Sequence, residues 1–425
     1  MKWIFWWGKM RFIERLNGFS STALQRVFRG IGRKYPRLKA EMVAELNRIW
    51  RNEPQEFLKR MGEAERRMLA DSVHGGREEV SPERLKARHG LHFRFDYDLG
   101  GRGGDPLQYS QLFVHHDYGE YLLLEDVRDA LRKHLPEPEA LKVKVAEPNL
   151  DELELFETEA AVFPGLKRML QLVAAGKLKV SEKTGMPSAA AMKVAAKALS
   201  GPDDPRGPDR PFIWPLLLQQ CGWAKFRAGK FGLTPAGKGL LECFSPEAFA
   251  EGLKELMHDA KFDEILRVSE IKGFRGKHAR RHWRSASGRR MDVFKALEAF
   301  PVGEWVSMDD AYAFLLASGG DCRVVAEGGS LYICDREYGA LWGEEWNIGK
   351  VYFRQLVCES LATLGLVDLL RREDSWYRPD LKESWGMDGL KELTRYDGIE
   401  HIRLTPLGRF CLGGGSETYE PPIAE

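Results

Sequence analysis

The chain contains 425 residues, of which 43% are hydrophobic, and this length predicts several packed domains rather than one. The formal net charge is only +1, but the first 40 residues contain ten Lys or Arg and a single acidic residue, a net of +9. The six cysteines show neither Cys-x-x-Cys nor zinc-ligand spacing, which predicts free thiols in a reducing compartment. No apolar run is long enough to span a membrane, so we expect a cytoplasmic protein without a cofactor.

Residues 1–52 are predicted to form a basic helical module. Helical patterns cover residues 22–32 and begin again at residue 39. A helix, a loop and a Lys-x-Glu-x-Val-x-x-Leu helix resemble the small DNA-binding module called the SAP domain over about 25 residues. The tryptophan-rich arm before these helices can pack on the fold, present its cations to DNA or lie on an anionic membrane. These three alternatives stay open.

Residues 53–135 are predicted to form an α+β domain that resembles a degenerate helix-turn-helix. Ser81 is expected to cap a helix that has Pro82 at its first position and Gly90 at its end. Acidic residues and histidines that could bind a metal for phosphodiester hydrolysis follow, although their spacing matches no motif: Asp96, Asp98, Asp105, His115, His116 and Asp117. A cryptic metal-dependent nuclease is therefore the lesser alternative for the function.

Residues 136–159 are predicted to be an acidic, proline-containing linker. The next stretch, residues 160–245, has the element order of a winged-helix domain. We expect helix 160–175, a short strand at 178–181, helices 188–199 and 212–221, and a hairpin of strands 223–226 and 230–233. Helix 212–221 is mostly apolar, so it is expected to be core or protein interface rather than a helix that reads bases.

Residues 246–287 are predicted to be a connector that is helical at first and then strongly basic. From residue 271 to residue 290 the chain has eight Lys or Arg, no acidic residue and interleaved aromatic residues. Guanidinium groups bind phosphate and aromatic rings stack on bases, so this stretch is the main candidate for nucleic-acid contact. Together with Lys183 and Lys193 of the preceding domain, the predicted nucleic-acid-binding residues are Lys272, Arg275, Lys277, Arg280, Arg281, Arg284, Arg289 and Arg290. The alternatives are that this stretch is a solvated basic loop, or that its cations pair with the acidic linker of the same chain.

Residues 288–413 are predicted to form a second winged-helix unit with an insertion at 319–347. We expect helices 290–300, 308–318 and 349–364, a short strand at 305–306, and strands 366–371 and 399–404. Ser307 is predicted to cap the second of these helices. The remaining residues, 414–425, are rich in Gly, Pro and Glu and are predicted to be a disordered tail.

Both winged-helix units end in the same motif, Leu-Thr-Pro-x-Gly-(Lys/Arg)-x-x-Leu, at residues 233–241 and 404–412. In each copy the Thr can cap a helix, and the Pro stands at the first helical position, where a missing N–H costs nothing. A strand that runs into such a helix is a common end of a winged-helix domain. The duplicated motif therefore predicts two wings in one chain.

Further stretches resemble a group of poorly characterised bacterial winged-helix proteins, some of them helicase-associated. The resemblance covers roughly residues 60–413. It rests on Gly303–Asp310, Leu361–Asp368 and Arg395–Gly398 in the second unit, and on Gly176–Thr184 and Trp214–Gln219 in the first. It implies a tandem winged-helix fold and a connection with DNA, but no reaction. Where the group tends to carry two arginines, this chain has Gly185 and Met186, so a phosphate contact at that point is expected to be absent.

Taken together, the sequence predicts a helix-rich α+β protein with tandem winged-helix units and a non-catalytic role. The expected partner is DNA, bound largely without sequence preference through its phosphates, and the expected task is that of accessory or adaptor for a helicase or nuclease in repair or defence. The rival class is a protein–protein scaffold that uses winged-helix modules without touching DNA.

Overall fold

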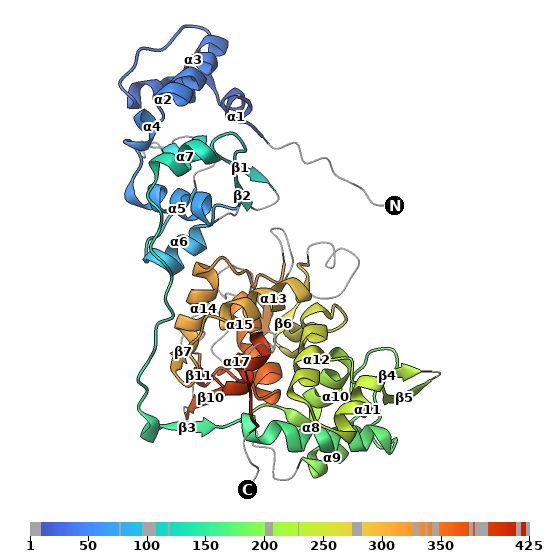
Figure 1. Cartoon of the computed structure of the whole chain (residues 1–425). Coiled ribbons are helices and arrows are strands. Elements are labelled where there is room, and N and C mark those ends of the chain that lie inside the picture. The colour runs from blue at the N-terminus through green and yellow to red at the C-terminus, as the bar shows by residue number, and fades with distance from the viewer. Residues whose placement is uncertain are drawn as a thin grey trace. The chain divides into compact units, whose positions relative to one another are not determined.

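The protein is α+β, about half helical, with small antiparallel sheets in this computed structural model. The structure describes residues 10–75, 78–95, 108–117, 120–199, 207–227, 229–273, 283–325, 331–335, 339–341, 348–373, 377–378, 390–413 and 418–421. The chain divides into two compact units (Figure 1). The N-terminal unit contains residues 1–141 with 316–319, and the C-terminal unit contains residues 142–315 with 320–425.

The N-terminal unit is mostly helical. Its elements are α1 (Phe12–Gly18), α2 (Ser21–Gly30), α3 (Lys39–Asn52), α4 (Gln55–Leu58), α5 (Glu63–His74), α6 (Pro82–His89), the 3-10 turn η1 (Tyr109–Leu112), strands β1 (Val114–Asp117) and β2 (Glu120–Leu123), and α7 (Arg128–His134). The predicted cap of α6 is confirmed, because the Ser81 side chain accepts from the Arg84 N–H, Pro82 begins the helix and Gly90 ends it with a positive φ. Strand β1 begins at Val114, directly after η1 and Phe113.

One hydrophobic core runs through the N-terminal unit from α1 to α7. At its centre four aromatic side chains from α1, α3, α4 and the segment before β1 meet. The ring of Phe113 stacks on Phe12 at 5.6 Å between centroids and lies 4.5 Å from Trp50. The predicted modules 1–52 and 53–135 thus share one core, because neither has enough apolar surface to bury by itself.

The C-terminal unit contains the remaining elements. Its first half has η2 (Leu150–Glu152), β3 (Leu153–Phe156), α8 (Glu159–Ala174), α9 (Ala189–Ala198), α10 (Arg210–Gln220), β4 (Ala224–Arg227), β5 (Lys230–Leu233), α11 (Pro235–Glu242) and α12 (Pro246–His258). Its second half has η3 (Glu264–Arg267), β6 (Ile271–Lys272), α13 (Ala286–Leu297), β7 (Trp305–Ser307), α14 (Met308–Ala317), β8 (Tyr332–Asp335), β9 (Gly339–Leu341), α15 (Ile348–Gln355), the π-helix η6 (Leu356–Leu361), β10 (Val367–Arg372), β11 (Ile399–Leu404) and α17 (Pro406–Leu412). We call residues 159–242 the first repeat and residues 286–412 the second repeat.

Each repeat has a hairpin before its last helix. In the first repeat β4 pairs with β5 alone, with Phe226 opposite Phe231. In the second repeat β10 and β11 form the hairpin, and they belong to a four-stranded antiparallel sheet of order β3-β10-β11-β7. The short strand expected at 178–181 is only an isolated bridge between Val180 and Pro187. The predicted linker 136–159 is not wholly a linker, because its residues 153–156 form β3 and pair with β10.

The Thr-Pro-x-Gly motif has the same geometry in both repeats, which confirms the predicted caps. The Thr234 hydroxyl donates to the Gly222 carbonyl at 2.7 Å and accepts from the Gly237 N–H at 3.1 Å. In the second repeat Thr405 makes the matching bonds to Gly365 and Gly408 at 2.7 and 2.9 Å. One threonine therefore ties the start of the last helix to the turn that precedes the hairpin.

The glycine of each motif is required by a close approach of backbone to backbone. A Cβ atom added at Gly237 would lie 2.0 Å from the Trp223 carbonyl oxygen, and one at Gly408 would lie 2.2 Å from that of Leu366. Such distances leave no room for a methyl group. The repeated sequence motif thus encodes a repeated packing of helix against strand.

Candidate nucleic-acid interface

In the winged-helix arrangement that the sequence predicts, the helix before each hairpin is the one that would read a DNA groove. In the first repeat this helix is α10, and its side chains are buried along nearly its whole length. In the second repeat it is α15 continued by η6, where all six π-helical residues are buried. The two segments pack against each other inside the C-terminal unit. Neither helix therefore has a free polar face for base edges.

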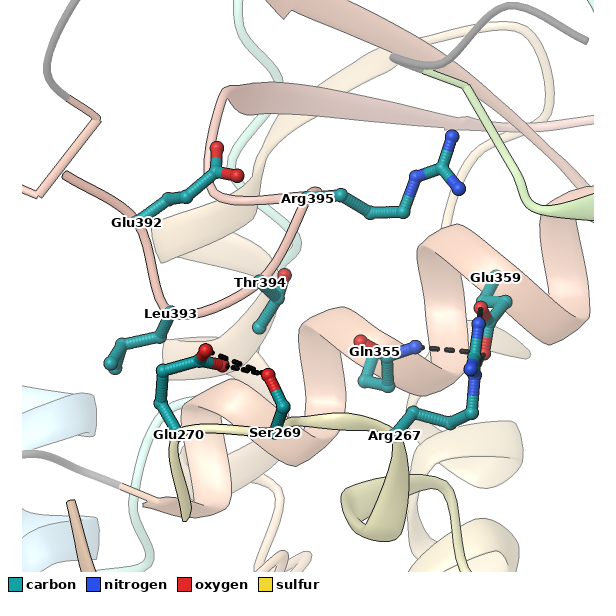
Figure 2. A pocket seen from close by; sticks show the side chains of 9 residues that line it. All are labelled: Arg267, Ser269, Glu270, Gln355, Glu359, Glu392, Leu393, Thr394 and Arg395. Carbon is teal, nitrogen blue, oxygen red and sulfur yellow. Dashed lines mark hydrogen bonds and ion pairs between the residues drawn. The ribbon is translucent and has the colours of Figure 1, made fainter. Parts of the chain in front are cut away.

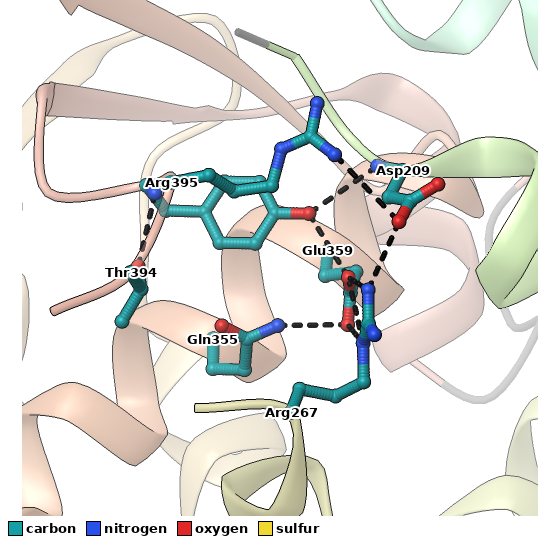
Figure 3. A network of polar contacts seen from close by, with 7 residues as sticks. Asp209, Arg267, Gln355, Glu359, Thr394 and Arg395 are labelled. Carbon is teal, nitrogen blue, oxygen red and sulfur yellow. Dashed lines mark hydrogen bonds and ion pairs between the residues drawn. The ribbon is translucent and has the colours of Figure 1, made fainter. Parts of the chain in front are cut away.

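A polar network connects the start of α10 with η6 (Figure 3). The Arg267 guanidinium bridges Asp209, 3.0 Å away, and the fully buried Glu359, also 3.0 Å away. Glu359 also accepts from the Tyr396 hydroxyl at 3.1 Å and from the Gln355 amide at 2.7 Å. Burial raises the pKa of Tyr396 well above its ordinary value, so this hydroxyl stays a neutral donor.

A pocket of about 230 Å³ opens beside this network (Figure 2). Nine residues line it: Arg267, Ser269, Glu270, Gln355, Glu359, Glu392, Leu393, Thr394 and Arg395. The Arg267 and Glu359 side chains at its floor already bind each other, and the Arg395 guanidinium lies 3.6 Å from Asp209. Because the two arginines are paired with these two carboxylates, we interpret the network as a structural contact between the two repeats rather than as a reactive site.

Two of the predicted nucleic-acid-binding arginines are engaged inside the protein. Arg290 is fully buried on α13 and donates to Glu264 at 2.8 Å, and Arg289 beside it is paired with Asp263 at 2.5 Å. The Arg289 guanidinium also lies 4.4 Å above the ring of Tyr352. In this arrangement neither guanidinium is accessible to a phosphate.

The other predicted cations differ in their surroundings. Arg284 forms an ion pair with Asp321, whereas Lys272 is exposed on β6. Lys183 and Lys193 are exposed before and on α9. Arg275, Lys277, Arg280 and Arg281 lie outside the described residues.

The β4–β5 hairpin carries three cations that the sequence analysis did not select: Lys225, Arg227 and Lys230 are all exposed. Arg227 stands directly opposite Lys230, and Lys225 stands opposite Gly232. Residues opposite each other or two apart on a strand share a face, so all three cations lie on one face of the hairpin. Figure 1 shows this hairpin extending from the helices around it. The signal in the sequence was the spacing Lys-x-Arg before the turn and Lys directly after it.

The whole first repeat is basic. Between residues 159 and 242 the chain has 13 Lys or Arg and six acidic residues, a net of +7. Beyond the hairpin, the exposed cations are Lys167, Arg168, Lys177, Lys179, Lys183, Lys193, Lys197 and Lys238. Among the described residues, none of these eight and none of the three hairpin cations forms an ion pair. The repeat thus presents a surplus of positive charge to solvent.

The alternative metal site receives no support from the described part of the chain. Within it, no group of three or more His, Cys, Asp or Glu side chains is placed to hold a metal ion. Of the six residues considered for such a site, His115, His116 and Asp117 belong to β1, while Asp96, Asp98 and Asp105 lie outside the described residues. A search of the described helices also finds none long and apolar enough to cross a membrane.

Comparisons of the chain with protein-family models, with curated proteins and with solved structures found no match. The function is therefore argued from the geometry above.

Proposed function

We propose that this chain is a tandem winged-helix protein that binds DNA through its phosphates, without reading sequence, and that the β4–β5 hairpin is its principal contact. The observation that carries the proposal is the hairpin face of Lys225, Arg227 and Lys230 on a repeat with a net charge of +7. We further propose that it serves a helicase or nuclease as an accessory or adaptor, in line with the resemblance to helicase-associated proteins.

The arrangement of the second repeat supports the winged-helix assignment. Apart from β8 and β9, which lie between α14 and α15, its elements follow the order helix, strand, helix, helix, strand, strand in α13, β7, α14, α15–η6, β10 and β11. Its first strand, β7, pairs with β11, and β11 pairs with β10, which is how a winged-helix sheet is ordered. The shared Thr-Pro-x-Gly geometry extends the same assignment to the first repeat.

The charges of the first hairpin support a polyanionic partner. Two like charges directly opposite each other in a hairpin, here Arg227 and Lys230, destabilise the strand pair by themselves. Phosphate groups would remove that repulsion, and releasing their counterions would add affinity. The hairpin of the second repeat is less suited to this role, because β3 already occupies the outer edge of β10.

The burial of α10 and of α15–η6 supports binding without sequence preference. Direct readout needs polar side chains that reach base edges, and these two segments are packed against each other instead. The same burial keeps the scaffold alternative open, because both segments are used for packing within the protein.

The proposal is tested by DNA affinity across a salt series from about 50 to 200 mM, comparing the wild type with the triple variant Lys225→Ala, Arg227→Ala and Lys230→Ala. The slope of log K against log salt is negative, and each lost phosphate contact reduces its magnitude by about 0.9. The triple change should therefore make the slope shallower by about 2.7. The matched control is Lys142→Ala, Lys261→Ala and Lys295→Ala, which removes the same charge from exposed lysines outside the first repeat.

The control variant should keep the wild-type slope within about 0.9, one phosphate contact. If both triples reduce the slope equally, the hairpin is not a specific contact. If the wild type fails to bind duplex or single-stranded DNA even at the lowest salt, the scaffold alternative replaces the DNA proposal.

A further inference from the structure

Strand β3 lies at the edge of the four-stranded sheet of the C-terminal unit. It pairs with β10 on one side, with Leu155 opposite Leu370 and Phe156 opposite Leu369. On its other side no strand of the described chain is paired with it. The N–H and C=O groups on that side of the strand are therefore available for main-chain hydrogen bonds.

The opposite edge of the same sheet, strand β7, has a main-chain partner from outside the sheet. There the Ala146 N–H donates to the Trp305 carbonyl of β7 at 2.8 Å, so the extended chain before β3 covers part of that edge. Proteins usually protect an edge strand by keeping it short or by a charged side chain, a proline, a bulge or a covering segment. β3 is a short strand, Leu-Glu-Leu-Phe, and contains Glu154, but it has no proline or lysine and pairs in regular register with β10.

The one exposed residue of β3, Leu155, is apolar. Leu155 is 44% exposed, and Leu150, in the turn just before the strand, is 54% exposed. An apolar strand with a free edge is the structure to which an extended peptide can add. Isolated exposed leucines are common on protein surfaces, but here they accompany unpaired main chain.

The charges around this edge select among possible occupants. Asp151, Glu152 and Glu157 flank the strand and are exposed. A second copy of the chain paired through its own β3 would bring these carboxylates together, and like charges in close register are destabilising. DNA is repelled for the same reason. The same carboxylates attract a segment that has Lys or Arg beside its apolar positions.

We propose that β3 is a docking edge for an extended segment of a partner protein, in which apolar residues alternate and Lys or Arg residues flank them. The segment adds to the sheet as a fifth strand beside β3. Its main-chain bonds supply affinity, Leu155 supplies an apolar contact, and the flanking carboxylates supply charge selection. This inference is independent of the DNA proposal, because it concerns a different edge and the opposite charge.

The probe is a fluorescent peptide, Lys-Lys-Val-Thr-Val-Thr-Val-Lys-Lys, titrated with the full-length protein. Leu155→Lys places a cation against the cationic peptide and should weaken binding at least about tenfold. The matched control is Leu266→Lys, since Leu266 is also 44% exposed and lies outside the sheet. This control should bind the peptide as the wild type does.

Two further arms keep the test decisive if Leu155→Lys disturbs folding. Replacing Asp151, Glu152 and Glu157 by the neutral amides should weaken binding and reduce its salt dependence, and a peptide with Pro at its central position should bind at least about tenfold more weakly. The proposal is overturned if the wild type does not bind the peptide, or if the Pro peptide binds equally well. It is also overturned if sedimentation shows a wild-type dimer that Leu155→Lys separates, because the occupant is then a second copy.

Discussion

Replacing Arg290 by methionine should destabilise the C-terminal unit strongly while leaving DNA binding intact. Arg290 and Glu264 are both fully buried, and the guanidinium also donates to the main-chain carbonyls of Leu256, Asp259 and Phe262. A single side chain of α13 thus holds the end of α12 and the segment before η3. Methionine fills a similar volume but makes none of these bonds.

The expected loss is about 3–5 kcal/mol, the usual cost when one partner of a buried ion pair is removed and the other is left behind. Burial already raises the pKa of Glu264, and Arg290 opposes that rise. Without Arg290, burial favours the protonated form of the Glu264 carboxyl group over the charged form. A raised pKa in the folded state gives stability at low pH that is lost as the pH rises, so the deficit of the variant should shrink as the pH falls toward 4.5, the ordinary pKa of a glutamate.

Urea unfolding followed by tryptophan fluorescence measures this loss, with Lys295→Met on the exposed face of the same helix as control, for which we expect a change of at most about 0.5 kcal/mol. The double variant Glu264→Gln with Arg290→Met should recover part of the loss, because it removes the uncompensated charge. A loss below about 1 kcal/mol for Arg290→Met would refute the reasoning. A drop in the salt slope of DNA binding would show that Arg290 touches phosphate after all.

Three further predictions follow from particular contacts. Gly237→Ala and Gly408→Ala should each lower the free energy of unfolding by about 1–3 kcal/mol, since each methyl group would collide with a main-chain carbonyl, and a variant as stable as the wild type would contradict the close approach. In the native protein a thiol reagent should modify Cys243 and spare the four described cysteines that are buried, as mass spectrometry of the labelled peptides can show; rapid labelling of Cys221 would argue against the packing of α10. Burial raises the pKa of Glu159 above its ordinary value of 4.5, so its contribution to stability is present below that pH and is lost as the pH rises through the higher folded-state pKa. The melting temperature of Glu159→Gln should therefore rise relative to that of the wild type as the pH is raised above 4.5. Melting temperatures of the two proteins that change in parallel with pH would exclude the effect.

The local features of the fold were predictable from the sequence. Thr234 and Thr405 cap their helices because the bonds that define a cap join residues three apart. The burial of α10 followed from its apolar composition, which the sequence analysis took as core or interface. Hairpin β4–β5 was found because alternating residues flank a glycine turn.

Features that depend on distant partners were not predictable in the same way. β3 forms a strand because it pairs with β10, more than 200 residues away, and in the sequence it looked like part of a linker. Arg289 and Arg290 belonged to the longest basic run, but their carboxylate partners Asp263 and Glu264 lie 26 residues earlier and bury them. The hairpin cations were missed because three charges spaced along two strands form no run in the sequence.

Hydrogen–deuterium exchange with and without duplex DNA tests the central claim most directly, because it locates the contact without any substitution. The account predicts slower exchange in the β4–β5 hairpin, residues 224–233, when DNA is added. It predicts no change in α10 or in residues 348–361, which are already packed against each other. Unchanged exchange in the hairpin with bound DNA, or new protection at residues 348–361, would contradict the account.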